Sequence, residues 1–118
     1  MNKVKIIATP TFQKELKKLA KKYPSTKEDY RGLLSYLTEN PMPKEYSIGA
    51  GLYKIRLKIG SLGKGKSSGA RVITAVETEV NEDGIKIYLA RIYEKSEKED
   101  LTSKEYVTIK KMYLKGGD

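Results

Sequence analysis

The middle of the sequence carries six cationic side chains and no carboxylate between residues 52 and 76. The six are Lys54, Arg56, Lys58, Lys64, Lys66 and Arg71. Clustered positive charge attracts a polyanion, and the planar fork of arginine matches two oxygens of a phosphate. The pattern therefore predicts a phosphate-binding surface, the alternative being a lysine-rich hairpin that serves only solubility.

RNA is a substrate on which such a surface could do chemistry, because its 2′-hydroxyl is a built-in nucleophile. An enzyme must then orient the attack, remove one proton, stabilise charge on the phosphate and protonate the leaving oxygen. Arg56 and Arg71 are assigned to the phosphate charge, since arginine does not give up its proton. Neighbouring cations favour the neutral form of a lysine, so Lys54, Lys64 or Lys66 is the candidate general base.

A second candidate group lies at the end of the strand expected over residues 85–93. Tyr93 and Lys95 have the same strand parity as Arg91. The Tyr93 phenol could stack on or orient a base, and the Lys95 ammonium could protonate the leaving oxygen. Arg91 is a reserve phosphate contact. The alternative for Tyr93 is half-buried packing.

The composition of the chain limits the other possibilities. Its 118 residues include 24 Lys and Arg against 15 Asp and Glu, and the net charge of +9 favours RNA, DNA or an acidic protein as partner. Without Cys or His, disulfides, thiolate nucleophiles and the commonest metal ligand are excluded, so no metal site is assigned. No stretch approaches a membrane span and the first residues are not a signal peptide, which predicts a cytoplasmic protein.

One motif in this region is misleading. Residues 60–67, GSLGKGKS, fit the phosphate-loop pattern GxxxxGK[ST]. That loop must lead into a helix, whereas here it leads into the β-branched run that begins at Arg71. We interpret the match as chance and expect no nucleotide cofactor.

The elements that position these residues can be read from the periodicity. Residues 3–8 are expected to form a strand, and a helix capped by Thr9 should carry an apolar stripe from Phe12 to Tyr23. A second helix should open at a capping box, residues 25–28, and end near Asn40. The two helices are expected to form an antiparallel hairpin.

From residue 52 the period changes to two. Residues 52–59, 70–80 and 85–93 are predicted to form an antiparallel meander with a tight turn at 81–84. A last helix should begin at Thr102, capped reciprocally by Glu105. The prediction is a single α+β domain over residues 1–118, in the order β-α-α-β-β-β-α.

Two segments carry a family resemblance. The sequence GLYKIRLKIGSLGKGKSSGARVIT, followed by IYLARIYEKSEKEDLTSKE, resembles the RelE/HigB branch of the RelE/ParE toxins. The shared pattern is a basic strand, a glycine-rich loop running into A-R-V-I, and a strand that ends in Tyr-x-Lys. The resemblance reaches from about Phe12 to Tyr106. Thr74 stands where the family often has an aromatic residue, and Ser68 replaces a glycine.

The resemblance implies a RelE/ParE-like fold, in which an antiparallel sheet carries an N-terminal helical hairpin and a C-terminal helix. It also implies a type II toxin that cleaves messenger RNA on the ribosome without a metal or cofactor, inhibits translation and is neutralised by a cognate antitoxin protein. The expected catalytic residues are Lys54, Arg56, Lys66, Arg71, Tyr93 and Lys95. Further RNA contacts are expected from Lys58, Lys64 and Arg91.

Two other functions stay open on the sequence. A ParE-type relative would share the fold and inhibit DNA gyrase without cleaving anything, and its basic site should be depleted. A non-enzymatic RNA-binding module would use the same surface only to hold phosphates, with a steep dependence on salt.

Overall fold

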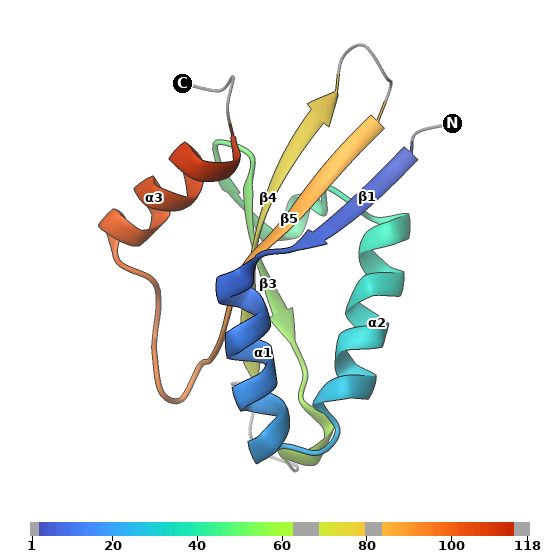
Figure 1. Cartoon of the computed structure of the whole chain (residues 1–118), viewed down its shortest axis with the longest axis vertical. Helices are drawn as coiled ribbons and strands as arrows, with labels where there is room; N and C mark the ends of the chain where they lie inside the picture. Colours follow the sequence, from blue (N-terminus) through green and yellow to red (C-terminus); the bar gives the residue numbers. More distant parts are fainter. Residues whose placement is uncertain (1–2, 63–68, 80–83, 115–118) are drawn as a thin grey trace.

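Three helices and a five-stranded mixed sheet make up the part of the chain that the structure, a computed structural model, describes: residues 3–62, 69–79 and 84–114 (Figure 1). The strands are β1 (Lys3–Ala8), β2 (Ser47–Gly49), β3 (Leu52–Leu57), β4 (Ala70–Glu79) and β5 (Gly84–Glu94). The helices are α1 (Pro10–Lys22), α2 (Thr26–Glu39) and α3 (Ser103–Tyr113), with short 3₁₀ turns at Lys44–Tyr46 and Gly60–Leu62. The α+β class and the element order are confirmed, apart from the additional β2.

The strands follow the order β1-β5-β4-β3-β2. The predicted meander is present, because β3, β4 and β5 pair antiparallel. A wholly antiparallel sheet was the wrong expectation, since β1 lies parallel to β5, from Lys3 beside Gly84 to Ala8 beside Leu89. Residue alternation in the sequence predicts which face of the sheet a side chain lies on, but not which strand pairs with which. The edge strand β2 was missed because three residues are too few to show a period.

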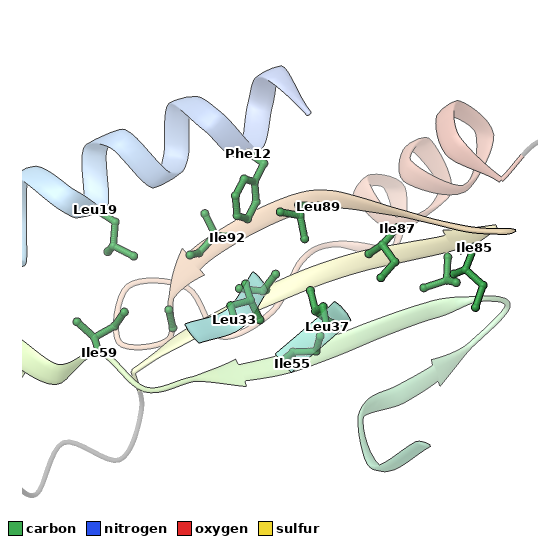
Figure 2. Close-up of a cluster of buried hydrophobic side chains, with 13 residues drawn as sticks. Phe12, Leu19, Leu33, Leu37, Ile55, Ile59, Ile85, Ile87, Leu89 and Ile92 are labelled. Atoms are coloured by element: carbon green, nitrogen blue, oxygen red, sulfur yellow. The ribbon is translucent and has the colours of Figure 1, made fainter. Parts of the chain in front are cut away.

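Helices α1 and α2 run antiparallel (Figure 1) and pack on one face of the sheet, where their apolar side chains meet those of the strands (Figure 2). The first core contains Phe12, Leu19, Leu33 and Leu37 from the helices, against Ile55, Ile87 and Leu89 from the strands. Helix α1 begins as expected, with the Thr9 hydroxyl accepting the Phe12 amide at 3.2 Å. The antiparallel helical hairpin is therefore confirmed.

The expected capping box of α2 is not formed. Ser25 occupies the N-cap in a helical conformation without a side-chain cap bond. Its hydroxyl instead donates to Asp29 at 2.7 Å and accepts the Ser61 amide at 2.8 Å. The start of α2 packs beside the segment that follows β3, and this tertiary contact replaces the local cap.

Helix α3 packs on the opposite face of the sheet over a second core. This core includes Leu52, Ile73, Ala75, Ala90, Leu101 and Ile109. The predicted cap of α3 is confirmed, because Thr102 accepts the Glu105 amide at 3.1 Å while Glu105 accepts the Thr102 amide at 2.8 Å. None of the described helices is long and apolar enough to cross a lipid bilayer.

Candidate active site on the cationic sheet face

A β-bulge in β5 decides which way its last residues face. Ile73 of β4 pairs with Arg91 and the next residue, Thr74, pairs with Leu89, so Ala90 is one residue too many. Leu89 and Ile92 both belong to the core under α1 and α2. Strict alternation from Leu89 would send Arg91 into that core. The bulge reverses the phase and directs Arg91 and the residues of its parity to the α3 face.

Thr9 holds this bulge in place. Its hydroxyl lies 2.9 Å from the carbonyl oxygen of Leu89 and 3.2 Å from that of Ala90, and its amide donates to Leu89 at 3.2 Å. Thr9 is buried, and the same hydroxyl caps α1. The sequence predicts an uninterrupted strand over residues 85–93. The bulge is visible in the sequence only at Leu89-Ala90-Arg91-Ile92, where the alternation of apolar and polar residues shifts by one position.

Cross-strand pairing brings the predicted site residues together. Arg56 of β3 pairs with Arg71 of β4, which pairs with Tyr93 of β5. In the adjoining row Lys54 pairs with Ile73, which pairs with Arg91. Directly opposed residues project from the same side of a sheet. We call the five polar members of these rows the cationic face: Lys54, Arg56, Arg71, Arg91 and Tyr93.

Two further predicted residues lie just beyond the ends of these strands. Lys58 follows the end of β3, and Lys95 follows the end of β5, where its amide donates to the Gly69 carbonyl at 3.0 Å. Lys64 and Lys66 lie outside the described residues. Lys58 and Lys95 thus follow β3 and β5 at the same end of the sheet, two residues beyond Arg56 and Tyr93.

The two arginines of the central row differ in exposure. Arg56 is exposed and, like Lys58, forms no ion pair within residues 3–62, 69–79 and 84–114. Arg71 is only 9% exposed, and its guanidinium donates to the Ala70 carbonyl at 3.1 Å. The row therefore combines one fixed guanidinium with one that can reach toward a ligand.

An acidic segment, residues 94–105, lies against the other cations. Lys54 Nζ is 3.2 Å from Asp100 Oδ1, and Lys95 Nζ is 3.6 Å from Glu99 Oε2. Glu105 lies 3.0 Å from Arg91. Sequence reasoning did not find these pairs, because Glu99 and Asp100 lie between β5 and α3, where no periodicity points to a partner, and the cap pattern at Glu105 does not indicate Arg91.

Arg91 joins both helical layers to the sheet. Glu15 of α1 lies 2.8 Å from one of its nitrogens, and Glu105 of α3 lies 3.0 Å from another. The hydrogen bond that Arg91 donates to Glu15 is the main cause of the raised pKa of Arg91. Hydrogen bonding to the Thr102 amide, with Arg91 and Lys98, lowers the pKa of Glu105 to about 2. Arg91 is held by carboxylates, so its expected role as a phosphate contact stays a prediction.

Tyr93 is 8% exposed and belongs to the second core. Its buried hydroxyl makes no hydrogen bond within the described ranges. Burial, with a contribution from the Asp100 carboxylate, raises the pKa of Tyr93 to about 12. At neutral pH the phenol is therefore protonated and can donate a hydrogen bond. For Tyr93 to stack on a base, the residues that pack on it in the second core, such as Leu101, would have to move.

The phosphate-loop match has the wrong surroundings. The described element after it is β4, a strand that pairs antiparallel with β3, rather than a helix. The amides of Gly60 and Ser61 already donate to Asp29 at 3.1 Å and Ser25 at 2.8 Å. The beginning of the motif is therefore bound to α2 instead of being open to a nucleotide.

No protein-family model matches this chain, and a search of curated proteins found no match either.

Proposed function

We propose that this chain is an endoribonuclease toxin of the RelE/HigB type that cleaves messenger RNA, with the cationic face as its active site. The observation that supports this most is the row Arg56, Arg71 and Tyr93, drawn from three strands. Neighbouring strands lie about 4.8 Å apart, so both guanidinium groups can reach one phosphate. Their forked donors match the oxygens that gain charge as the phosphate is attacked.

In the proposed reaction the 2′-oxygen bonds to phosphorus and the bond from phosphorus to the 5′-oxygen breaks. The proton of the 2′-hydroxyl passes to the neutral amine of Lys54, Lys64 or Lys66, which for Lys54 requires separation from Asp100, and the Lys95 ammonium gives a proton to the 5′-oxygen. Arg56 and Arg71 stabilise the charge on the phosphate, and Tyr93 orients the adjoining nucleotide. One product then ends in a 2′,3′-cyclic phosphate and the other begins with a 5′-hydroxyl.

The partners in this proposal are messenger RNA, the ribosome and a cognate antitoxin. Lys58, Lys64 and Arg91 would hold RNA around the scissile phosphate, as the net charge of +9 favours. No metal or nucleotide cofactor takes part. The site of action would be the cytoplasm, and the outcome would be a block of translation.

Mapping RNA 5′ ends in growing cells tests the proposal. Induction of the wild-type chain should create new 5′ ends within messenger RNA, and Arg71→Ala should abolish them. Arg31→Ala is the matched control, because Arg31 is an exposed arginine of α2 that pairs with Glu28, away from the cationic face. Intact transcripts together with blocked DNA supercoiling would instead support the gyrase inhibitor.

One observation favours a second candidate, the non-enzymatic RNA-binding module. Tyr93 is buried, while Lys54 and Arg91 are paired with carboxylates, which suits a surface that holds phosphates without chemistry. For that module, Arg71→Ala should reduce RNA affinity alone and lower the salt dependence of binding. For the nuclease, turnover should fall far more than affinity.

A further inference from the structure

A groove opens beside the cationic face, between strands β2 and β3 and helix α3. Its volume is about 390 Å³, and its lining includes Ile48, Leu52, Lys54, Asp100, Tyr106 and Val107. Ile48 is 44% exposed and Val107 is 43% exposed, so apolar surface is open to solvent on both the strand side and the helix side. Lys54 belongs to both the groove and the cationic face. A strand of RNA held there by its phosphate could therefore place a neighbouring base in the groove.

The carboxylate of Asp100 is fixed at one end of this groove. Its Oδ1 atom accepts the Leu101 amide at 2.8 Å, the Tyr106 hydroxyl at 2.5 Å and the Lys54 ammonium at 3.2 Å. None of these three contacts involves its Oδ2 atom, and the buried Tyr93 hydroxyl is a further donor near this carboxylate. Oδ2 is thus the oxygen at which a ligand in the groove would meet the Asp100 carboxylate. Although burial acts in the opposite direction, the bonds from Tyr106 and Lys54 keep the pKa of Asp100 below its usual value.

We propose that this groove binds one nucleobase of the RNA substrate and that Asp100 selects a base with an exocyclic amino group. The inference rests on the proposed function, because it needs an RNA phosphate on the cationic face. A base has two apolar faces, which Ile48 and Val107 can contact, and a polar edge. The Oδ2 atom of Asp100 accepts from the amino group of cytosine, adenine or guanine. Uracil has no amino group: its only donor, N3–H, lies between two carbonyl oxygens that the carboxylate repels, so uracil pairs less well with Asp100.

The variant Asp100→Asn makes the proposal specific. Three donors converge on the Oδ1 position, and only the carbonyl oxygen of an asparagine can accept them. The amide nitrogen must then take the Oδ2 position, where it donates a hydrogen bond rather than accepting one. Asp100→Asn should therefore move the preference from amino-bearing bases toward uracil, whose O4 atom is an acceptor.

The test uses four short RNAs that differ only at one base beside the cleaved phosphate, varied on either side in turn and supplied free and on programmed ribosomes. The readout is kcat/KM for the full chain. At one position the wild type should cut the uracil RNA at least about tenfold more slowly than the best amino-bearing RNA, as expected for one lost hydrogen bond to a charged group. Asp100→Asn should remove or reverse this difference.

Glu97→Gln is the matched control, because Glu97 is an acid of the same segment that pairs with Lys22 and does not line the groove. It should keep the wild-type base preference. Val107→Ala should lower kcat/KM for all four RNAs, because it removes a contact to the face of the base.

The outcomes separate the two proposals. If the wild type cleaves RNA but treats uracil like the other bases at every flanking position, the groove proposal is overturned and the nuclease stands. The same holds if Asp100→Asn is folded, active and unchanged in preference. If the wild type cuts no RNA on or off the ribosome, both proposals are lost. The wild-type comparison needs no variant, so it decides the matter even if Asp100→Asn does not fold.

Discussion

The bulge in β5 leads to a prediction about Thr9, a residue outside the cationic face. Thr9→Val keeps the shape of the side chain and replaces the hydroxyl with a methyl group. The α1 cap bond is lost, at about 1 kcal/mol, and the buried Ala90 carbonyl loses its Thr9 partner, at about 1–3 kcal/mol. The free energy of unfolding should therefore fall by about 2–4 kcal/mol, measured by urea denaturation followed by circular dichroism.

Two control variants separate the hydroxyl from general effects of substitution. Thr9→Ser keeps the hydroxyl and should retain most of the stability. Thr11→Val changes an exposed residue of the same helix and should stay within about 0.5 kcal/mol of the wild type. Under conditions where Thr9→Val is still folded, RNA cleavage should fall as well, because the bulge sets the direction of Arg91 and Tyr93. Stability of Thr9→Val within about 0.5 kcal/mol of the wild type would refute the assigned role of the hydroxyl.

Three further predictions concern Arg71 in the cationic face, Glu105 beside it and Gly69 before β4. Arg71→Lys keeps the charge but not the fork, so single-turnover cleavage should slow by about 10²–10³-fold, and a loss below about fivefold would contradict the assignment. The pKa of Glu105 is about 2 in the folded protein and 4.5 for an ordinary glutamate. The ionised carboxylate therefore stabilises the fold fully above pH 4.5, and this contribution is lost as the pH falls toward 2. The difference in urea stability between wild type and Glu105→Gln should therefore shrink over that range, and a constant difference would argue against the ion pairs. Gly69→Ala should lower the free energy of unfolding by more than about 1 kcal/mol, because Gly69 has φ of +50° and the new Cβ would lie 2.6 Å from the Leu57 carbonyl oxygen. Gly32→Ala is the control: its new Cβ meets nothing within 4 Å, so this substitution should stabilise α2.

Much of the fold was accessible from local sequence patterns. The alternation after Leu52 identified the meander, and the caps at Thr9 and Thr102 located the starts of α1 and α3. The parallel pairing of β1 was not accessible, because it depends on how the chain returns after α2. The side chain of Ser25 likewise follows a tertiary contact, with Ser61, in place of its local preference.

The candidate site likewise has parts that the sequence predicts and parts that it does not. The rows that bring Arg56 and Arg71 together follow from the hairpin of β3 and β4, so their proximity was a fair inference from the sequence. The burial of Tyr93 and the pairing of Lys54 with Asp100 depend on how residues 94–105 lie on the sheet. Between β5 and α3 this segment is irregular, so its own residue pattern does not predict where it lies.

The chemistry at the cleaved bond is the most direct test of the cationic face as an RNA-cleaving site. A short messenger RNA on programmed ribosomes should yield one fragment with a 2′,3′-cyclic phosphate and one with a 5′-hydroxyl, identified by mass spectrometry. Replacing the single 2′-hydroxyl at that bond with hydrogen should prevent cleavage there. Unchanged cutting of the 2′-deoxy RNA, or intact RNA from an active toxin preparation, would contradict the account.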